Sequence, residues 1–415
     1  MKRIKIWVLL FISLVGVVGI ISGIYYQNYL SNLNEERKEI KKIESRLAEQ
    51  EKMNATYQQY VIVNKDSSLY DYDESSKEYI EAGKIKEGIT LELDTLDLES
   101  TYFKIKDTSY YIPYQDVDKT ENSLDTRYQS YIPFYQVSFN GEYSFLDQEG
   151  NQVLTIYLND TLPIYEQIGE LYGVELFSQI FYIGKDTSLT LNEVEEEKAS
   201  SIPVLNYHFI YLNGDGSCQE SICHSEEQIK EHFSYLHDNH VLTITTEELG
   251  RFIDGEINLP RKTVLITIDD GARAENFIPF LEQYDLKATL FLVSSWYPTS
   301  MFQSSNLELA SHTHNLHTVG VCEGGQGSGI RCLPEEEIQA DLKASRETLN
   351  NTKAFCYPFY EYNDYAKEQV KKAGFELGFI GGSTKVTRNT DKYLIPRYPI
   401  QATTNVNFIK NLIEN

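Results

Sequence analysis

Two short polar motifs in the second half of the chain hold side chains that could do metal chemistry. Asp269 and Asp270 follow the apolar run TVLITI, and His312 and His317 follow the run LELA. Adjacent carboxylates at the end of a buried strand repel each other unless a cation or a shared proton lies between them. One Asp and two neutral imidazoles form the open site that a catalytic zinc ion uses, which leaves a position for water. The second Asp can then accept the proton of that water.

The alternative interpretation is that Asp-Asp-Gly forms a turn and the histidines are surface residues. The elements around the motifs argue against it, because apolar strand-like runs alternate with amphipathic helices over residues 202–415. The expected strands are PVLNYHF, VLTIT, TVLITI, ATLFLV, LELA, AFCYPF and LGFIG, and the expected helices cover 226–237, 247–254, 276–284, 335–349 and 364–373. This alternation predicts a parallel sheet or barrel with helices outside it. Such a barrel places its chemistry at the C-terminal ends of its strands.

The motifs resemble those of the polysaccharide deacetylases of carbohydrate esterase family four, the NodB-homology domains. PVLNYH at 203–208 is similar to the opening strand of that family, and TIDDG at 267–271 is similar to its first catalytic motif. HTHNLH at 312–317 is similar to the histidine motif of poly-N-acetylglucosamine deacetylases, with His314 as a bystander. The resemblance covers 202–415 and implies an α/β fold, with a C-terminal (β/α) deacetylase-type barrel.

The resemblance also implies roles for these residues. Asp269 would be the general base, while Asp270, His312 and His317 would hold zinc or another divalent metal. The reaction would remove the acetyl group from an N-acetylated sugar, with Asp269 accepting a proton from water. Backbone N–H groups, including that of Phe359, would hold the oxyanion.

Two departures from the family pattern leave roles open. Many members read Arg-x-Pro-Tyr in their third motif, which is CYPF at 356–359 here, so a cysteine replaces the arginine that orients the base. Arg397 is predicted to supply the missing charge, and the alternative is a structural surface arginine. The late histidine that often serves as general acid has no counterpart, because all eight histidines lie at or before His317. His208, or the water-derived proton held by Asp269, is expected to protonate the leaving amine.

The N-terminus predicts a membrane anchor. A basic end at 1–5 precedes an uncharged run at 6–26, whose 21 residues span about 30 Å as a helix, enough to cross a bilayer core. The positive end stays inside, so the rest of the chain is expected outside the cell membrane. A cleaved signal peptide is the alternative, but no clear A-x-A site follows. Residues 27–58 then show helical periodicity in a highly charged stretch, which predicts a stalk.

The middle of the chain predicts β-rich domains without a recognisable catalytic motif. Residues 60–118 contain short alternating runs and resemble, weakly, a bacterial SH3-like domain of the kind that holds wall material; a plain spacer domain is the alternative. Residues 129–191 mix strand-like runs with an expected helix around 164–172, as a small α/β or β domain. The acidic segment 192–201 is expected to be a linker.

Composition restricts the partners. With 37 Lys and Arg against 62 Asp and Glu, the formal charge is −25, which argues against nucleic acid and favours a neutral or cationic substrate.

One or two disulfides are expected among four of the five cysteines, because an external compartment lets them persist; a four-thiolate zinc site is the alternative. Cys356 is expected to be a buried free thiol, and GGQGSG at 324–329 a flexible tether. These four cysteines are Cys218, Cys223, Cys322 and Cys332.

The sequence therefore leads to one main function and one alternative. The main hypothesis is a membrane-anchored, metal-dependent N-deacetylase that acts outside the cell on N-acetylglucosamine-containing peptidoglycan or a wall-linked polysaccharide. The alternative is a catalytically inactive glycan-binding protein with a deacetylase-like fold, motivated by the absent late histidine and by Cys356. The complete set of two carboxylates and two histidines favours the enzyme.

Overall fold

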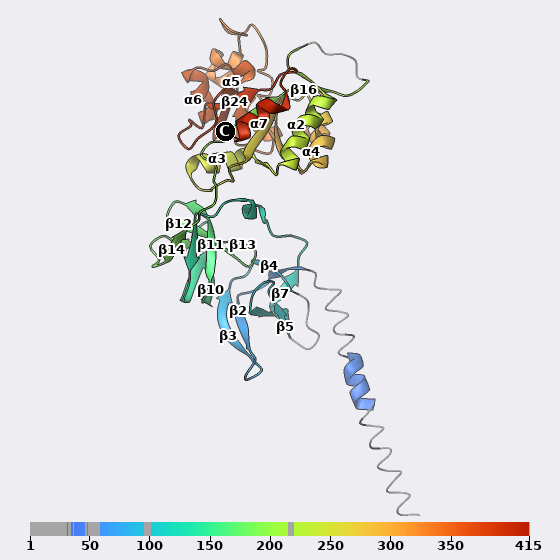
Figure 1. Cartoon of the computed structure of the whole chain (residues 1–415), viewed down its shortest axis with the longest axis vertical. Coiled ribbons are helices and arrows are strands. Elements are labelled where there is room, and N and C mark those ends of the chain that lie inside the picture. Colours follow the sequence, from blue (N-terminus) through green and yellow to red (C-terminus); the bar gives the residue numbers. More distant parts are fainter. Residues whose placement is uncertain are drawn as a thin grey trace, which may run out of the picture. The chain divides into compact units, whose positions relative to one another are not determined.

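The structure is a computed structural model in which the chain forms two compact units. It describes residues 31, 35, 37–45, 48, 59–94, 101–214 and 220–414. Residues 37–45 are helical, as the periodicity of 27–58 predicts (Figure 1). The expected anchor at 6–26 lies outside the described residues and stays a prediction. Within the described ranges, no helix has both the length and the apolar character needed to span a membrane.

The first unit contains the described residues up to 124 together with 141–158 and 177–179, and it is built from short antiparallel strands. Alternate residues of these strands are buried, for example Leu69, Phe103 and Ile112, which confirms that 60–118 is β-rich. The likeness to an SH3-like domain stays a prediction. The strands are β1 Tyr60–Val63, β2 Ser67–Asp73, β3 Glu78–Ile85, β4 Thr90–Glu92, β5 Tyr102–Lys104, β6 Tyr110–Pro113, β7 Val117–Lys119, β9 Gly141–Leu146 and β10 Gln152–Leu158.

The second unit begins with antiparallel strands and does not contain the expected helix around 164–172. That helix is wrong, since this segment forms the hairpin of β11 and β12 with Gly169 in its turn (φ 52°). Burial alternates from Ile164 to Glu166, so the strand period decides the structure. Glu248 of the barrel region accepts hydrogen bonds from Arg127 and Tyr131, at 2.6 and 2.9 Å. The predicted domain limits stay predictions. The strands are β8 Tyr135–Ser138, β11 Thr161–Ile168, β12 Leu171–Leu176, β13 Gln179–Gly184 and β14 Thr190–Glu193.

A closed parallel barrel forms the rest of the second unit. Its seven described strands run in the order β15-β24-β23-β22-β21-β20-β19, and β15 pairs with β19 to close the ring. All eight residues of β19 are buried, as expected for a strand covered on both sides. The strands are β15 Val204–Tyr207, β19 Thr263–Asp270, β20 Ala288–Leu292, β21 Leu307–Ser311, β22 Ala354–Cys356, β23 Leu377–Gly381 and β24 Ile395–Pro399, with β18 Leu242–Thr243 added beside β19.

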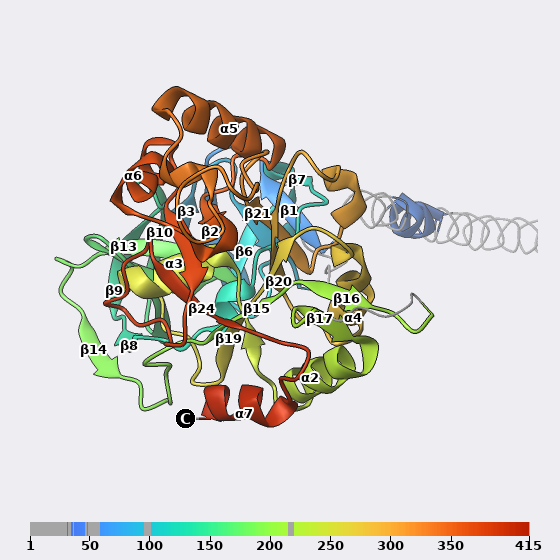
Figure 2. The same cartoon turned by 90° about the horizontal axis from the view of Figure 1, so that it is seen from above.

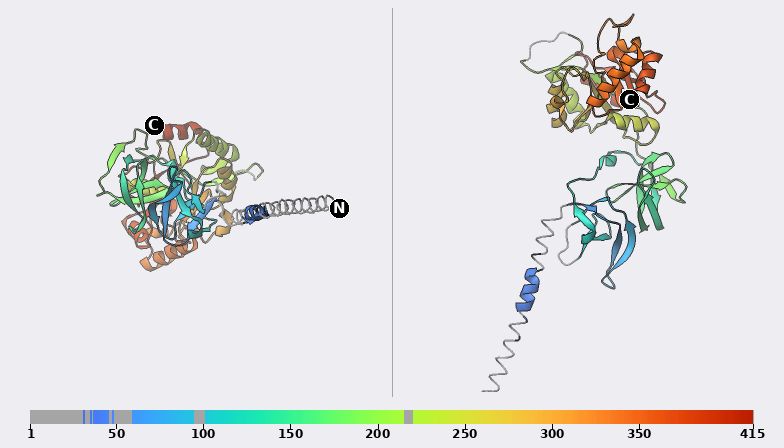
Figure 3. Two further views of the ribbon diagram at one scale, coloured as in Figure 1. Left: turned by 90° about the horizontal axis from the view of Figure 1, so that it is seen from below. Right: turned by 180° about the vertical axis from the view of Figure 1, so that it is seen from behind.

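Helices lie outside the barrel strands, as Figures 2 and 3 show. They are α2 Glu226–Asp238, α3 Thr246–Asp254, α4 Ile278–Gln283, α5 Glu335–Thr348, α6 Asp364–Lys372 and α7 Val406–Glu414. Local capping explains where some begin and end, since α3 starts with a capping box of Thr245 and Glu248 and ends at Gly255 (φ 81°). The alternation is thus confirmed, although the sequence missed β24, α7 and the short parallel pair of β16 Phe209–Tyr211 and β17 Cys223–Ser225.

The cysteines are largely in the predicted states. Cys322 and Cys332 form a disulfide, Cys223 is also disulfide-bonded, and Cys356 is free and buried. Cys218 lies outside the described residues. A zinc site made of four thiolates is therefore wrong, because two of the required sulfurs are bonded to each other. The expected tether at 324–329 is likewise wrong in the structure, since hydrogen bonds close this loop on itself.

Candidate active site

Asp269 and Asp270 end strand β19 at the C-terminal end of the barrel. Asp270 has a left-handed backbone (φ 74°), which Asp tolerates better than most residues. Gly271 continues the turn with φ 112°, and a Cβ there would collide with Leu292. The side chains of both carboxylates are buried, at 2% exposure for Asp269 and 12% for Asp270.

The predicted ligand residues converge on one point. Nε2 of His312 lies 3.4 Å from Oδ1 of Asp270, and Nε2 of His317 lies 3.3 Å from the same oxygen. One ligand atom from each of the three residues lies within 4.8 Å of the others. His312 follows β21, while the ring of His317 contacts the rings of Trp296 and Phe359, at centroid distances of 5.3 and 4.3 Å.

The donor chemistry of this cluster fits a divalent metal. Nδ1 of His312 lies 2.8 Å from the carbonyl of Cys356, so a proton on Nδ1 leaves Nε2 free to coordinate. Burial lowers the pKa of His317 to about 4, which keeps that imidazole neutral. Burial alone would also lower the pKa of His312, but Cys356 and Asp270 outweigh it and raise that pKa. The groups around His312 thus favour a positive charge at this point, which either a proton on the ring or a bound cation supplies. Two nitrogens and one carboxylate oxygen suit zinc and similar ions.

Arg397 holds Asp269 in a buried ion pair. Its Nη1 and Nη2 contact Oδ1 and Oδ2 of Asp269 at 2.7 and 2.8 Å, and its side chain is fully buried. Burial raises the pKa of Asp269, but Arg397 and His312 outweigh that effect and lower it below its usual range. Asp269 is therefore ionised and can accept hydrogen bonds. The alternative of a surface arginine is wrong, because β24 carries Arg397 into the barrel interior.

The comparisons with known proteins point to one family. Residues 256–378 match the family model described as polysaccharide deacetylase. Residues 256–378 therefore belong to a polysaccharide deacetylase domain. A poly-beta-1,6-N-acetyl-D-glucosamine N-deacetylase of Staphylococcus epidermidis is 28% identical over 243 residues, covering 49% of this chain and 80% of that protein. The protein of the same name from Staphylococcus aureus is 25% identical over 232 residues, covering 48% and 79%. The solved structure of IcaB from Ammonifex degensii is 21% identical, with a TM-score of 0.45, and the match covers 53% of this chain and 100% of that one.

His208 also reaches the site of the deacetylase domain. It follows β15, and its Nε2 lies 3.9 Å from Oδ2 of Asp269. Its Nδ1 is buried and has no hydrogen-bond partner in the described part of the chain. Burial lowers the pKa of His208, so the ring is neutral near pH 7. The expected bystander His314 lies next to Ser294, whose Oγ is 3.0 Å from its Nδ1.

The sequence indicates no role in this site for Asn206 and Tyr360, and it places Cys356 in the core. Asn206 donates to Oδ2 of Asp269 (3.1 Å) and to the hydroxyl of Tyr360 (2.6 Å), and its position two residues before His208 was the available signal. Cys356 is buried as predicted, but it lines the site, with Sγ 2.9 Å from Nη2 of Arg397 and 3.7 Å from Asp269. Cysteine at this position therefore leaves room for an arginine that comes from another strand.

Proposed function

We propose that this protein is a metal-dependent N-deacetylase that removes acetyl groups from N-acetylglucosamine units of a cell-surface glycan. The observation that supports it most is the cluster of Asp270, His312 and His317 beside an Asp269 that is fixed by Arg397. This arrangement separates a metal-binding carboxylate from one that remains available to accept a proton. It also counts against the inactive alternative. The family's arginine is missing at position 356, but Arg397 supplies a buried positive charge beside Asp269.

The residues of the chain divide the reaction between them. Zinc or another divalent ion held by Asp270, His312 and His317 would polarise the acetyl carbonyl and make a water molecule more acidic. Asp269 accepts the proton of the attacking water, and its ion pair with Arg397 keeps both carboxylate oxygens in place. The proton taken up by Asp269 then reaches the leaving amine by way of His208, whose Nε2 lies 3.9 Å from Oδ2 of Asp269, and the products are acetate and a free amino sugar.

The substrate and its location are inferred from sequence and likeness. Both staphylococcal relatives are named for poly-beta-1,6-N-acetyl-D-glucosamine, which supports a glucosamine-containing polymer as substrate. Peptidoglycan and other wall-linked polysaccharides contain the same chemical group. The apolar run at 6–26 with its basic end supports anchoring in the cell membrane, with the deacetylase domain outside. Persistent disulfides fit that compartment.

Release of acetate from a panel of glycans tests this function. Purified protein is incubated with peptidoglycan or poly-β-1,6-N-acetylglucosamine, with and without a chelator, and the free amines are identified by mass spectrometry. We expect His312→Ala and His317→Ala to lose both bound metal and acetate release. His314→Ala is the matched control, because it removes a histidine from the same segment without touching the cluster. Unchanged metal content in the first two variants would exclude the assigned ligands, and an absence of acetate release from every glycan would exclude the function.

A further inference from the structure

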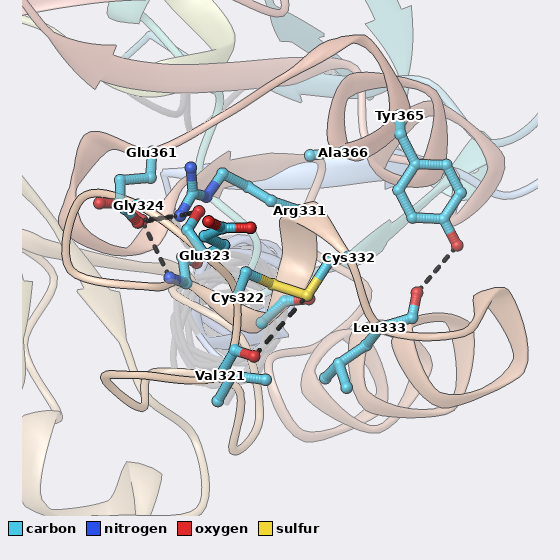
Figure 4. The surroundings of a disulfide bond; sticks show 12 residues. Val321, Cys322, Glu323, Gly324, Arg331, Cys332, Leu333, Glu361, Tyr365 and Ala366 are labelled. Atoms are coloured by element: carbon cyan, nitrogen blue, oxygen red, sulfur yellow. Dashed lines mark hydrogen bonds and ion pairs between the residues drawn. A yellow bond between two sulfur atoms is a disulfide. The ribbon is translucent and has the colours of Figure 1, made fainter.

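The segment between His317 and α5 is closed by a disulfide, and it is called here the disulfide loop, residues 319–332. Cys322 and Cys332 are 10 residues apart in sequence and are cross-linked (Figure 4). Inside the loop, the N–H groups of Val321 and Cys322 both donate to the carbonyl of Gly327, each at 3.0 Å. The loop therefore has a defined internal structure directly after a ligand residue of the metal cluster.

Glu361 connects this loop to the rest of the barrel. One carboxylate oxygen accepts from the N–H of Gln326, and the other accepts from the N–H of Ser328 at 2.9 Å. Arg331 forms an ion pair with the same carboxylate at 3.1 Å, as Figure 4 shows. A Cβ at Gly325 would collide with the carboxylate of Glu361, so a larger residue there would have to displace that side chain. The side chain of Glu361 is only 14% exposed.

Glu361 directly follows a strained turn. Phe359 and Tyr360 both have left-handed backbones, with φ of 58° and 60°. Each such non-glycine residue costs about 1–2 kcal/mol, so the conformation persists only where surrounding contacts hold it. On one side, Tyr360 accepts a hydrogen bond from Asn206, which also contacts the proposed base. On the other side, the contacts of Glu361 with the disulfide loop hold the turn.

The turn presents Phe359 to the metal cluster. The ring centroids of Phe359 and His317 are 4.3 Å apart, so the position of the turn affects the ligand histidine directly. We propose that Glu361 is a positioning residue, through which the disulfide loop holds the turn of residues 358–360 in the geometry that the reaction requires. This inference rests on the proposed deacetylase function. A shift of about 1 Å in such a support can lower the rate by about a hundredfold.

Substitution of Glu361 by Gln tests this role with little change in volume. The amide cannot accept from two N–H groups and also pair with Arg331, so the loop and the turn should separate. We expect Glu361→Gln to lower kcat at least about tenfold, with KM changed less than about twofold and metal content unchanged. Glu323→Gln, an exposed glutamate in the same loop, is the matched control and should leave all three quantities unchanged.

The contribution of the disulfide is tested by a double-mutant cycle. If the loop acts through Glu361, then Cys322→Ser with Cys332→Ser should lower kcat as well, and Glu361→Gln in that background should lower it little further. The inference would be overturned if the losses in kcat caused by the cysteine substitutions and by Glu361→Gln multiplied in the combined variant. A normal kcat in Glu361→Gln alone would also overturn it. Hydrogen exchange of residues 357–361 gives a readout without substrate. Exchange there should increase in Glu361→Gln but not in Glu323→Gln, and an unchanged pattern would overturn the inference even if the wild-type chain released no acetate.

Discussion

Replacement of Arg397 by Met should leave Asp269 as an uncompensated charge in the barrel interior. The guanidinium makes two contacts with that carboxylate, at 2.7 and 2.8 Å, and contacts the hydroxyl of Thr267 at 3.2 Å. Met fills much of the same volume but offers no donor, so the hydrophobic packing changes less than the electrostatics. Breaking a buried ion pair by removing one partner typically costs about 3–5 kcal/mol, and we expect a loss of this size.

A double variant separates charge from packing. In Arg397→Met with Asp269→Asn, the amide needs no counter-charge, so most of the lost free energy of unfolding should return. Because Arg397 lowers the pKa of Asp269 in the folded state, the stabilising contribution is present above about pH 4 and is lost as the pH falls further. Measurements at pH 7 therefore report the full contribution of the pair.

Denaturant unfolding of the four proteins in this cycle, at constant metal concentration, measures the coupling free energy. We expect a coupling of at least about 2 kcal/mol, since the two side chains are in direct contact and both are buried. A loss below about 1 kcal/mol for Arg397→Met would contradict the reasoning. So would a double variant that is no more stable than the single one, because the buried charge would then not be the cause.

Three further outcomes follow from the site. Asp269→Asn should keep its metal, but its rate of acetate release should fall at least about a hundredfold, the usual scale for loss of a general base. If Asp269→Asn loses the metal while Asp270→Asn keeps it, the two roles are reversed. His208→Ala should lose activity on N-acetyl sugars but keep it on an activated aryl acetate, whose leaving group needs no proton, and equal losses on both substrates would refute the assignment as general acid. Cys322→Ser with Cys332→Ser should lower the free energy of unfolding by about 2.7 kcal/mol, from the loop entropy of a cross-link spanning 10 residues, and thermal unfolding without any shift in Tm would contradict this.

The local sequence determined the barrel and which side chains gather at the end of its strands. Helical and strand periods differ, so the alternation from residue 202 onward could be recognised without tertiary information. Parallel strands end at the same edge of a barrel, so Asp270, His312 and His317 could be placed together from their positions after apolar runs. The structure brings these residues within 4.8 Å of one another. In each case the signal lies within a few residues of the side chain concerned.

Contacts between distant parts of the chain could be decided only by the tertiary structure. Arg397 lies 128 residues beyond Asp269, and its role depends on the closure of the barrel, in which β15 pairs with β24 on one side and with β19 on the other. The helix expected around 164–172 failed for a similar reason, because pairing with strands on both sides overrides a weak local pattern. The link from Glu361 to residues 326–331 is likewise a contact across the fold. Periodicity reports which face of an element is apolar, but the partner across that face is chosen by packing of the whole chain.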